Sequence, residues 1–355
     1  LAELLDLVAL GTIADVVTLD HNNRILVSQG LARIRAGRSH AGLRALLRIS
    51  GRDPTRLGSG DLAFSLAPRL NAAGRLDDMS LGIECLLSDD LEECMGFARR
   101  LDSLNAERRD IGAKMESQAN EILKKMEISV DNAPSGVCLF DEAWHQGVVG
   151  ILASRLKERL NRPAIVFARS SDQELKGSAR SVAGVHIRDV LGSIAVNEPG
   201  LIAKFGGHAM AAGVSLRPDA LNRFRTAFDA ALENHPGVEI GEPMIYSDGP
   251  LSGSEVDVST ADALRMAIPW GAGIPEPLFD GVFGVLERRW LKKRHLKFRL
   301  SIAGSERPVD AIAFGLGPDC DFVDAHKIRA VYRLAVNDYS GRVTPQLILE
   351  HVSAI

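Results

Sequence analysis

The chain has 355 residues, of which 46% are hydrophobic and 25% charged, and its formal net charge is −4. This composition is that of a globular protein of two or three domains, and it excludes extensive disorder, collagen-like repeats and histone-like basic proteins. No window approaches the ~20 uninterrupted apolar residues of a membrane-spanning helix, so we expect no membrane partner. The four cysteines are widely spaced without a CxxC pair, which predicts free buried thiols and a cytoplasmic location.

The first part of the chain is predicted to be helical. Residues 4–19 run apolar with breaks at Gly11 and Asp15, a pattern that predicts a helix, a tight turn and a short buried segment. A further helical stretch is expected to end near Pro68. Apolar residues at helical spacing also predict helices at 22–34 and 42–49.

The stretch from Leu81 to Met126 contains no proline, and its apolar side chains recur mostly at every third, fourth or seventh residue. This spacing predicts one long amphipathic helix or a helical pair. A single helix would suit a spacer between two lobes. A pair would form an antiparallel hairpin packed on one lobe.

The remaining residues change pattern near Pro236. Residues 137–235 alternate strand and helix signals, which predicts a compact α/β domain. The residues after Pro236 show short β-like runs separated by Gly, Pro, Asn and Asp, beginning with MIYSDGPL at 244–251. About five strands in ~110 residues predict a small barrel, with the OB-fold as first choice.

The motif GTIAD at 11–15 places Asp15 at the end of an apolar run. A carboxylate in such a position can ligate a hard divalent cation. The alternative is an aspartate that caps a helix.

The segment APRLNAAGR at 67–75 combines small residues with Arg69, Asn71 and Arg75. Small residues allow close backbone approach, and two arginines with an amide suit a phosphate oxyanion. The alternative is the end of a helix with two solvated arginines.

The segment GSARS at 177–181 follows a strand-like stretch. In an extended backbone Ser178 and Arg180 point to the same face, so that a hydroxyl and a guanidinium can share one phosphate. A polar edge strand is the alternative.

The segment FGGHAMAAG at 205–213 places Gly206 and Gly207 directly before His208. Two glycines allow a strained loop whose N–H groups and imidazole face a ligand. A lone histidine is usually structural, but this setting favours contact with a ligand.

The stretch ERRWLKKRHLKFRL at 287–300 carries seven Lys/Arg side chains with Trp290 and Phe298 between them. On a barrel face the cations would bind phosphates and the rings would stack on bases, whereas a solvated hairpin tip would explain the charge equally well. The residues we expect to bind DNA here are Arg289, Trp290, Lys292, Lys293, Arg294 and Lys297. Asp319, Asp321, Asp324 and His326 mimic a metal cluster, but an acidic loop is the simpler interpretation.

Six motifs, in this order and spacing, resemble the RecJ family of single-strand-specific 5′ to 3′ exonucleases. They are GTIAD, APRLNAAGR, WHQGVVGILASRL, GSARS, GGHAMAAG and PWGAGIPEPLF. The resemblance covers essentially the whole chain and extends to the DHH/DHHA1 phosphoesterase superfamily. It implies the C-terminal part of a DHH catalytic domain at 1–80, a long connecting helix at 81–130, a DHHA1 domain at 131–236 and an OB-fold at 237–355.

The resemblance also implies roles for single residues. Asp15 would be the last aspartate ligand of a two-metal site for Mn²⁺ or Mg²⁺, which activates water. Ser178 and Arg180 would hold the 5′-terminal phosphate with Arg75 or Arg69 beside them, and His208 would face the scissile region. Asn71, Gly206 and Gly207 belong to the same proposed DNA-binding set.

The chain departs from the family pattern in its metal ligands. The earlier aspartate motifs and the DHH triplet should precede Asp15, and none stands in a plausible position. We therefore expect a fragment that binds single-stranded DNA without cleaving it, because each hard cation takes ~6 ligands.

Two other functions stay open: an oligonucleotide or cyclic-dinucleotide phosphodiesterase of the same superfamily, and a catalytically inactive DNA-binding scaffold. For the exonuclease, the resemblance implies DNA repair and recombination. The implied partners are single-stranded DNA, single-strand-binding protein and a RecQ-type helicase.

Overall fold

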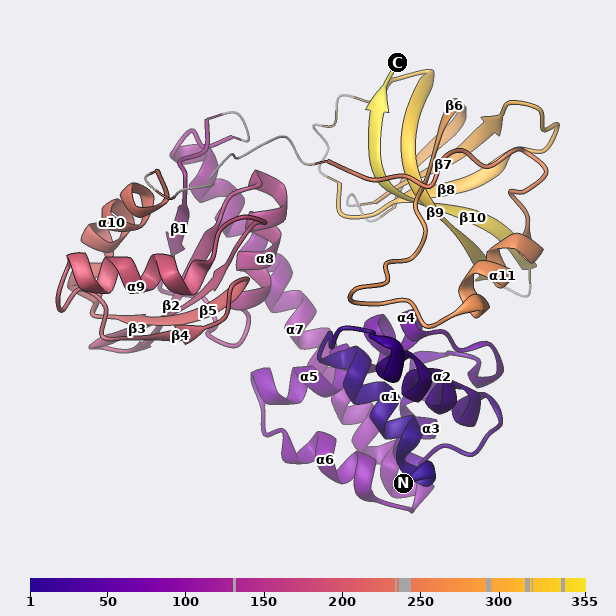
Figure 1. The fold of residues 1–355 in the computed structure, drawn as a ribbon, viewed down its shortest axis with the longest axis horizontal. Coiled ribbons are helices and arrows are strands. Elements are labelled where there is room, and N and C mark those ends of the chain that lie inside the picture. Colours follow the sequence, from indigo (N-terminus) through magenta and orange to yellow (C-terminus); the bar gives the residue numbers. More distant parts are fainter. Residues whose placement is uncertain are drawn as a thin grey trace. The chain divides into compact units, whose positions relative to one another are not determined.

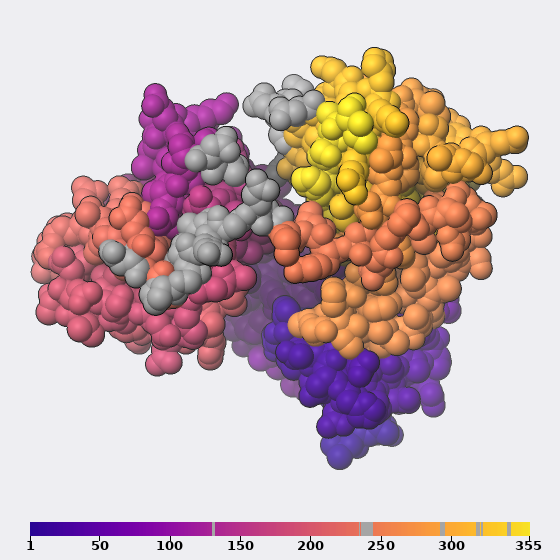
Figure 2. All heavy atoms as spheres, turned by 45° about the horizontal axis from the view of Figure 1, so that its top comes forward, coloured from indigo at the N-terminus to yellow at the C-terminus, as the bar shows by residue number. Residues whose placement is uncertain are grey.

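The computed structural model describes residues 1–129, 132–233, 235, 244–291, 295–316, 320, 322–339 and 342–355. The chain divides into two compact units. The first unit joins Leu1–Pro68 to Met244–Ile355, and the second is Arg69–Pro243. Figure 1 traces the elements of both. In the first unit the amino-terminal helices pack against residues before the barrel, as Figure 2 shows in indigo and orange.

The amino-terminal helices are α1 (Leu5–Ala14), α2 (His21–Arg35), α3 (Ala41–Ser50) and the short α4 (Ser59–Asp61), with 3-10 turns at Ala2–Leu4 and Pro54–Arg56. Asp20 caps α2 by accepting a hydrogen bond from the backbone N–H of Asn23 at 2.8 Å. The predicted break at Gly11 is wrong, because a single glycine weakens a helix without ending one whose other residues are buried. The predicted buried segment is also wrong, since Val16 and Val17 are exposed.

A buried carboxylate fixes α1 against α3. Asp6 is fully buried and accepts hydrogen bonds from the backbone N–H of His40 at 2.7 Å and from its Nδ1 at 2.9 Å. His40 directly precedes α3. The position of α1, and with it of Asp15 at its end, is therefore set by a polar contact in the core.

The predicted helix end near Pro68 is wrong. A π-helical segment, Leu62–Leu66, leads directly into α5 (Ala67–Leu76), and the N–H of Ala67 donates to the carbonyl of Leu62 five residues back. Pro68 has no N–H and its ring collides with the carbonyl four residues earlier in a regular α-helix. The wider π turn relieves that collision, so the helix continues through the APRLNAAGR motif.

The carboxy-terminal strands form a closed barrel in the order β10-β8-β7-β6-β9. They are β6 (Phe279–Leu291), β7 (His295–Ile302), β8 (Val309–Ala313), β9 (Lys327–Tyr339) and β10 (Arg342–Ala354). Along β7, Leu296, Phe298 and Leu300 are buried while Lys297 and Arg299 point outward. The predicted five-stranded barrel is confirmed.

The region before the barrel differs from the prediction. Residues 244–250 contain no regular secondary structure, so the strand expected at MIYSDGPL is wrong. A helix that the sequence interpretation missed, α11 (Val258–Ala267), follows. The residue that could have predicted the start of this helix is Asp257. As the N-cap, Asp257 accepts a hydrogen bond from the N–H of Thr260 at 2.7 Å.

The second unit begins with helices. The segment predicted as one helix or a pair contains a short α6 (Ser80–Leu87) and a long α7 (Leu91–Lys125) of 35 residues. At 1.5 Å per residue α7 is about 52 Å long. Asp90 caps its start, and Lys124 and Lys125 lie in its last turn, so the charges oppose the helix dipole.

A mixed sheet follows, with strands in the order β1-β2-β3-β5-β4. They are β1 (Val137–Phe140), β2 (Ala164–Ser171), β3 (Glu174–Arg180), β4 (Lys204–Gly207) and β5 (Ala211–Leu216). Helices α7 and α8 (Val149–Leu160) pack on one face. Helices α9 (Ile187–Asn197) and α10 (Leu221–Glu233), the latter after a 3-10 turn at Pro218–Ala220, pack on the other. The predicted α/β domain followed by a barrel is confirmed.

Within the described ranges, no helix combines the length and apolar character needed to cross a membrane. Cys85, Cys94 and Cys138 are buried, and Cys320 is half-buried. Burial raises the pKa of the Cys138 thiol to about 12, so this thiol is unreactive at neutral pH.

Candidate functional site

Ser178 and Arg180 lie together on β3 of the second unit. The Nη1 of Arg180 donates to the hydroxyl of Ser178 at 2.9 Å and to the carbonyl of Ala179 at 2.8 Å. Both side chains point to the face of the sheet that α8 covers. Strand β3 lies between β2 and β5, so the alternative of a polar edge strand is wrong.

The first turn of α8 packs directly on this pair. A Cβ at Gly150 would lie 2.9 Å from Nη2 of Arg180 and 3.0 Å from the hydroxyl of Ser178, distances that real side chains avoid. Glycine at this position is what allows the helix start to come so close. A helix N-terminus carries partial positive charge, so α8 adds to the attraction of an anion here.

The structure separates the two arginines of the APRLNAAGR segment. Arg75 lies against the turn before α8, where its Nη1 donates to the carbonyl of Gly147 at 3.3 Å. Arg69 instead forms an ion pair with Asp102 at 2.8 Å. Asn71 is exposed on the same helix. Of the two candidates, Arg75 is therefore the one beside the Ser178 and Arg180 pair.

Arg108 on α7 is a further cation that the sequence interpretation missed. Its guanidinium donates to Oδ1 of the buried Asn105 at 2.8 Å. One turn later Gly112 faces Val148 at the start of α8. Its place in the sequence could have indicated such a role, because Arg108 interrupts the apolar stripe of α7. That stripe is formed by Leu101, Leu104, Ile111 and Met115. An arginine on a buried stripe needs an anionic or hydrogen-bonding partner.

These three guanidiniums form a group that we call the arginine cluster: Arg75, Arg108 and Arg180. No carboxylate pairs with any of them among the residues that the structure describes. Burial and the charge of Arg75 lower the pKa of Arg180. Burial, followed by the charges of Arg75 and its other arginine neighbours, lowers the pKa of Arg108. Arginine nevertheless stays protonated, so the cluster is an uncompensated positive site.

The sheet beside the cluster offers an open surface. Ser178 pairs with Gly213 on β5, which pairs with Gly206 on β4, and a Cβ at either glycine would meet nothing within 4 Å. Residues directly opposite in antiparallel strands share a face, so a bare backbone surface extends from Ser178 across two strands. A ligand backbone can lie on such a surface.

The predicted glycine-rich loop is a β-hairpin between β4 and β5. Gly207 has φ 147°, and a Cβ there would lie 2.4 Å from the carbonyl oxygen of Ala211, so glycine is required. His208 follows in the turn, with its N–H donating to Ala211 at 2.8 Å. Its imidazole is exposed and has no hydrogen-bond partner in the described ranges.

Asp15 in the first unit ends α1. Its carboxylate is exposed and lies at the C-terminal end of the helix, so it does not cap free N–H groups. It adds negative charge to the negative end of the helix dipole, a location that favours a bound cation.

The described residues do not by themselves form a metal site. No group of three His, Cys, Asp or Glu side chains among them could hold a metal ion. Asp15 fits as one oxygen ligand of a hard divalent cation, which takes about six ligands. Asp319 and Asp321 of the acidic loop lie outside the described residues.

The backbone after Asp15 is strained. The N–H of Val16 donates to Ile13 at 3.2 Å and that of Val17 donates to Thr12 at 3.1 Å, which is a Schellman motif. This motif places Val16 at φ 55°, where glycine is usual. A left-handed conformation costs a β-branched residue about 1–2 kcal/mol, and such strain concentrates at functional sites.

The basic stretch forms the β6–β7 hairpin, and Lys292, Lys293 and Arg294 lie outside the described residues. Arg289 is exposed, while Lys297 pairs with Asp310 at 2.7 Å. The prediction that Phe298 stacks on bases is wrong, because its ring is buried in the barrel core. Trp290 packs partly against the same core. Among the residues described, Arg289 and Arg299 are the exposed cations of this hairpin, and Arg299 pairs with Glu287 at 3.7 Å.

Two domain families match the chain. Residues 133–234 match the DHHA1 domain and residues 247–351 match the RecJ OB domain. Both matches fall inside the corresponding predicted domains, whose boundaries themselves stay predictions.

Curated relatives match over nearly the whole chain. The chain is 49% identical over 356 residues to the single-stranded-DNA-specific exonuclease RecJ of Dickeya dadantii. It is 46% identical over 356 residues to that of Escherichia coli. Each match covers 99% of this chain and 61% of the relative, so the chain spans about three-fifths of these relatives' length.

Solved structures of RecJ also match over the whole of this chain. The crystal structure of RecJ in complex with Mg²⁺ from Thermus thermophilus matches with a TM-score of 0.77 and 29% identity. That match covers 100% of this chain and 52% of the solved chain. The Mn²⁺ complex of the same protein matches with the same TM-score and identity, and with 50% of its chain covered. RecJ structures thus contain either of these two divalent ions.

Proposed function

The chain belongs to the RecJ family, and from that premise we propose that it binds the 5′-phosphorylated end of single-stranded DNA for a metal-dependent 5′ to 3′ exonuclease. The observation that carries this proposal is the arginine cluster. Hydrogen bonds satisfy donors of Arg108 and Arg180 but leave the positive charge of these partly buried guanidiniums uncompensated, so an anion binds favourably beside them. A terminal phosphate provides up to two negative charges and three acceptor oxygens.

We propose different roles for the residues of the phosphate site. We assign Arg180 and Ser178 to direct contact with the phosphate. Their side chains lie against the first turn of α8, and they form a hydrogen bond with each other. Arg75 and Arg108 would supply the remaining positive charge from α5 and α7. A 5′-hydroxyl would leave these groups without an anionic partner, so we expect a preference for phosphorylated ends.

The rest of the strand would be held without regard to sequence. The bare surface at Gly213 and Gly206 accommodates a sugar-phosphate backbone, and Gly207 and the exposed His208 border it. On the barrel, Arg289 and the neighbouring basic residues would bind phosphates. None of these groups reads base edges, so sequence preference should be slight.

Hydrolysis requires metal ligands beyond those described here. We propose that Asp15 supplies one ligand to Mn²⁺ or Mg²⁺, and that most others come from residues outside these 355. When bound, the ions would activate water and stabilise the phosphodiester transition state. His208 is proposed to act on the scissile region.

Equilibrium binding tests the end-recognition proposal. A 3′-labelled oligothymidylate with a 5′-phosphate should bind about 10- to 100-fold more tightly than its 5′-hydroxyl counterpart. Arg180→Ala should remove that difference. Arg223→Ala is the matched control, because Arg223 is exposed and paired with Glu198 at 2.6 Å. Equal affinity of the unmodified chain for both ends would overturn the proposal.

A nuclease assay tests the metal proposal. The 355-residue chain with Mn²⁺ should bind the phosphorylated strand and release no mononucleotides. In a full-length protein of this family that carries this chain, Asp15→Ala should abolish metal binding and turnover. If Asp15→Ala keeps both metal binding and turnover, the proposed role of Asp15 is wrong. If the 355 residues alone release mononucleotides in a metal-dependent reaction, the proposal that most metal ligands lie outside them is wrong.

We further propose a cytoplasmic role in DNA repair and recombination, with single-strand-binding protein and a RecQ-type helicase as partners. This part rests on family membership alone. Co-purification of either protein with the chain, in the absence of DNA, would test it.

A further inference from the structure

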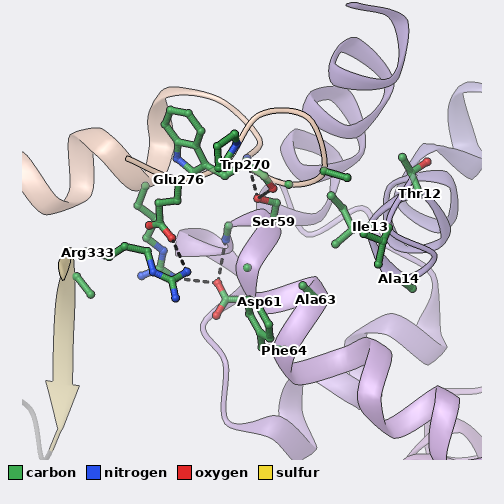
Figure 3. Close-up of a pocket in the computed structure, with 18 of the residues that line it drawn as sticks. Thr12, Ile13, Ala14, Ser59, Asp61, Ala63, Phe64, Trp270, Glu276 and Arg333 are labelled. Carbon is green, nitrogen blue, oxygen red and sulfur yellow. Dashed lines mark hydrogen bonds and ion pairs between the residues drawn. The ribbon is translucent and has the colours of Figure 1, made fainter. Parts of the chain in front are cut away.

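The first unit contains a cavity of about 550 Å³ close to Asp15 in the sequence. Its walls come from the end of α1, the segment from α4 into the π turn, the loop at 270–276 and strand β9 of the barrel. Figure 3 shows Thr12, Ile13 and Ala14 of α1 on one side, with Trp270 and Glu276 on the loop. The loop belongs to the PWGAGIPEPLF motif, to which the proposed function assigns no role.

The cavity is held rigidly by polar contacts. The hydroxyl of Ser59 donates to the carbonyl of Trp270 at 2.7 Å and accepts from its N–H at 3.0 Å. Asp61 accepts from the backbone N–H of Gly58 at 2.9 Å and from Arg265 at 2.8 Å. Such a site is formed before any ligand arrives, which lowers the entropy lost on binding.

The charges that line the cavity are balanced. Asp61 pairs with Arg265 and, at 3.5 Å, with Arg52. Arg333 pairs with Glu276 at 3.3 Å and with Glu350. Each guanidinium of the lining thus has a carboxylate, and the cavity does not require an anion.

Apolar side chains are unusually exposed around the same cavity. Phe64 is 77% exposed and Val16 is 72% exposed, and both contribute to the lining together with Val17. Phe64 lies on the π-helical segment, a type of irregular turn that is frequent at functional sites. Val16 is held at this rim by the strained backbone described above. An exposed aromatic ring beside a preformed, charge-balanced cavity suits a flat uncharged ligand.

We propose that this cavity binds one nucleobase of the single strand, stacked on Phe64 with Val16 at its edge. The location supports a base near the scissile phosphate, because Ala14 and Val16, which flank Asp15, line the cavity. Leu334, Ala335 and Val336 of β9 also line the cavity, and OB-fold barrels bind oligonucleotides on their strand faces. This inference rests on the proposed function and deepens it by naming a subsite for the base.

A double-mutant cycle tests the proposal. Oligonucleotides with one abasic nucleotide, moved stepwise from the 5′ end, are titrated against the 355-residue chain and against Phe64→Ala. At one position the abasic nucleotide should weaken binding to the unmodified chain about 5- to 100-fold, as expected for one lost stack. In Phe64→Ala that penalty should disappear, and Phe64→Tyr should restore it.

Two further variants separate binding from folding. Val16→Gly relieves the strained backbone, so it should keep the melting temperature while lowering affinity at the same abasic-sensitive position. Leu87→Ala removes another exposed apolar side chain, on α6, and should leave affinity unchanged.

The outcomes distinguish this inference from the proposed function. If no position couples to Phe64 while the 5′-phosphate preference persists, the base subsite is wrong and the proposed function stands. If neither the phosphate preference nor strand binding is seen, the proposed function itself fails.

Discussion

Two groups of arginines in this protein have opposite surroundings. Arg75, Arg108 and Arg180 of the second unit have no carboxylate partner in the described part of the chain. In the cavity of the first unit, each guanidinium is paired with an aspartate or a glutamate. The difference indicates which site is built for an anion and which is built for an uncharged ligand.

The two arrangements also differ in what they do for stability. A paired guanidinium in a partly buried site stabilises the fold, and removal of its partner leaves a charge without compensation. An unpaired guanidinium in a similar site opposes folding until an anion binds. The cavity arginines should therefore contribute mainly to stability, and the arginine cluster mainly to binding.

Asp61→Asn should have the largest effect and should act on stability. The carboxylate of Asp61 forms ion pairs with Arg52 and Arg265 and accepts a hydrogen bond from the N–H of Gly58. Its loss therefore leaves two guanidiniums without this negative charge. We expect the free energy of unfolding to fall by about 2 kcal/mol in urea denaturation. Arg180→Ala is the comparison and should change it by less than about 0.5 kcal/mol. Equal losses in the two variants would break the contrast between the sites.

Arg108→Gln should act on binding instead. Glutamine keeps a donor for Asn105 but removes one positive charge from the cluster. The preference for a 5′-phosphate should fall about tenfold, equivalent to about 1.4 kcal/mol, in the paired-oligonucleotide titration. An unchanged preference would exclude Arg108 from the phosphate site.

Gly150→Ala should have a smaller effect through geometry alone. The added methyl would displace the Arg180 guanidinium and the Ser178 hydroxyl, so the phosphate preference should fall by about 1 kcal/mol while the helix stays folded. Gly192→Ala on α9 is the matched control, because its Cβ would meet Phe205 only at 3.9 Å. It should leave binding unaltered. Similar binding losses in the two variants would mean that the close contact at Gly150 is unimportant.

Arg289→Ala should have the smallest effect. An exposed cation on the barrel contributes one phosphate contact, so affinity should fall about 2- to 3-fold for any sequence, and the slope of log affinity against log salt should decrease by about one. The variant should leave the 5′-phosphate preference intact. A change in that preference would link the barrel hairpin to end recognition.

The sequence alone determined the fold class, the five-stranded barrel and the shared face of Ser178 and Arg180. These features depend on local periodicity: alternation along a strand, helical spacing and the turn residues between elements. It also placed the anion-binding motifs in order, because each motif is continuous in the chain. It failed at Pro68 and at residues 244–251, where a π turn and irregular backbone replaced the regular patterns.

Only the tertiary structure decided which arginine joins Ser178 and Arg180, and which side chains are free to bind. Arg69 and Arg75 lie in one motif, yet Asp102 pairs with the first and Gly147 contacts the second. Phe298 belongs to the basic stretch by sequence, but the barrel buries it. Partners and burial depend on residues that are distant in the chain, so no local pattern contains them. The net charge of −4 is a sum over all residues, whereas the binding chemistry depends on which charges remain unpaired after folding.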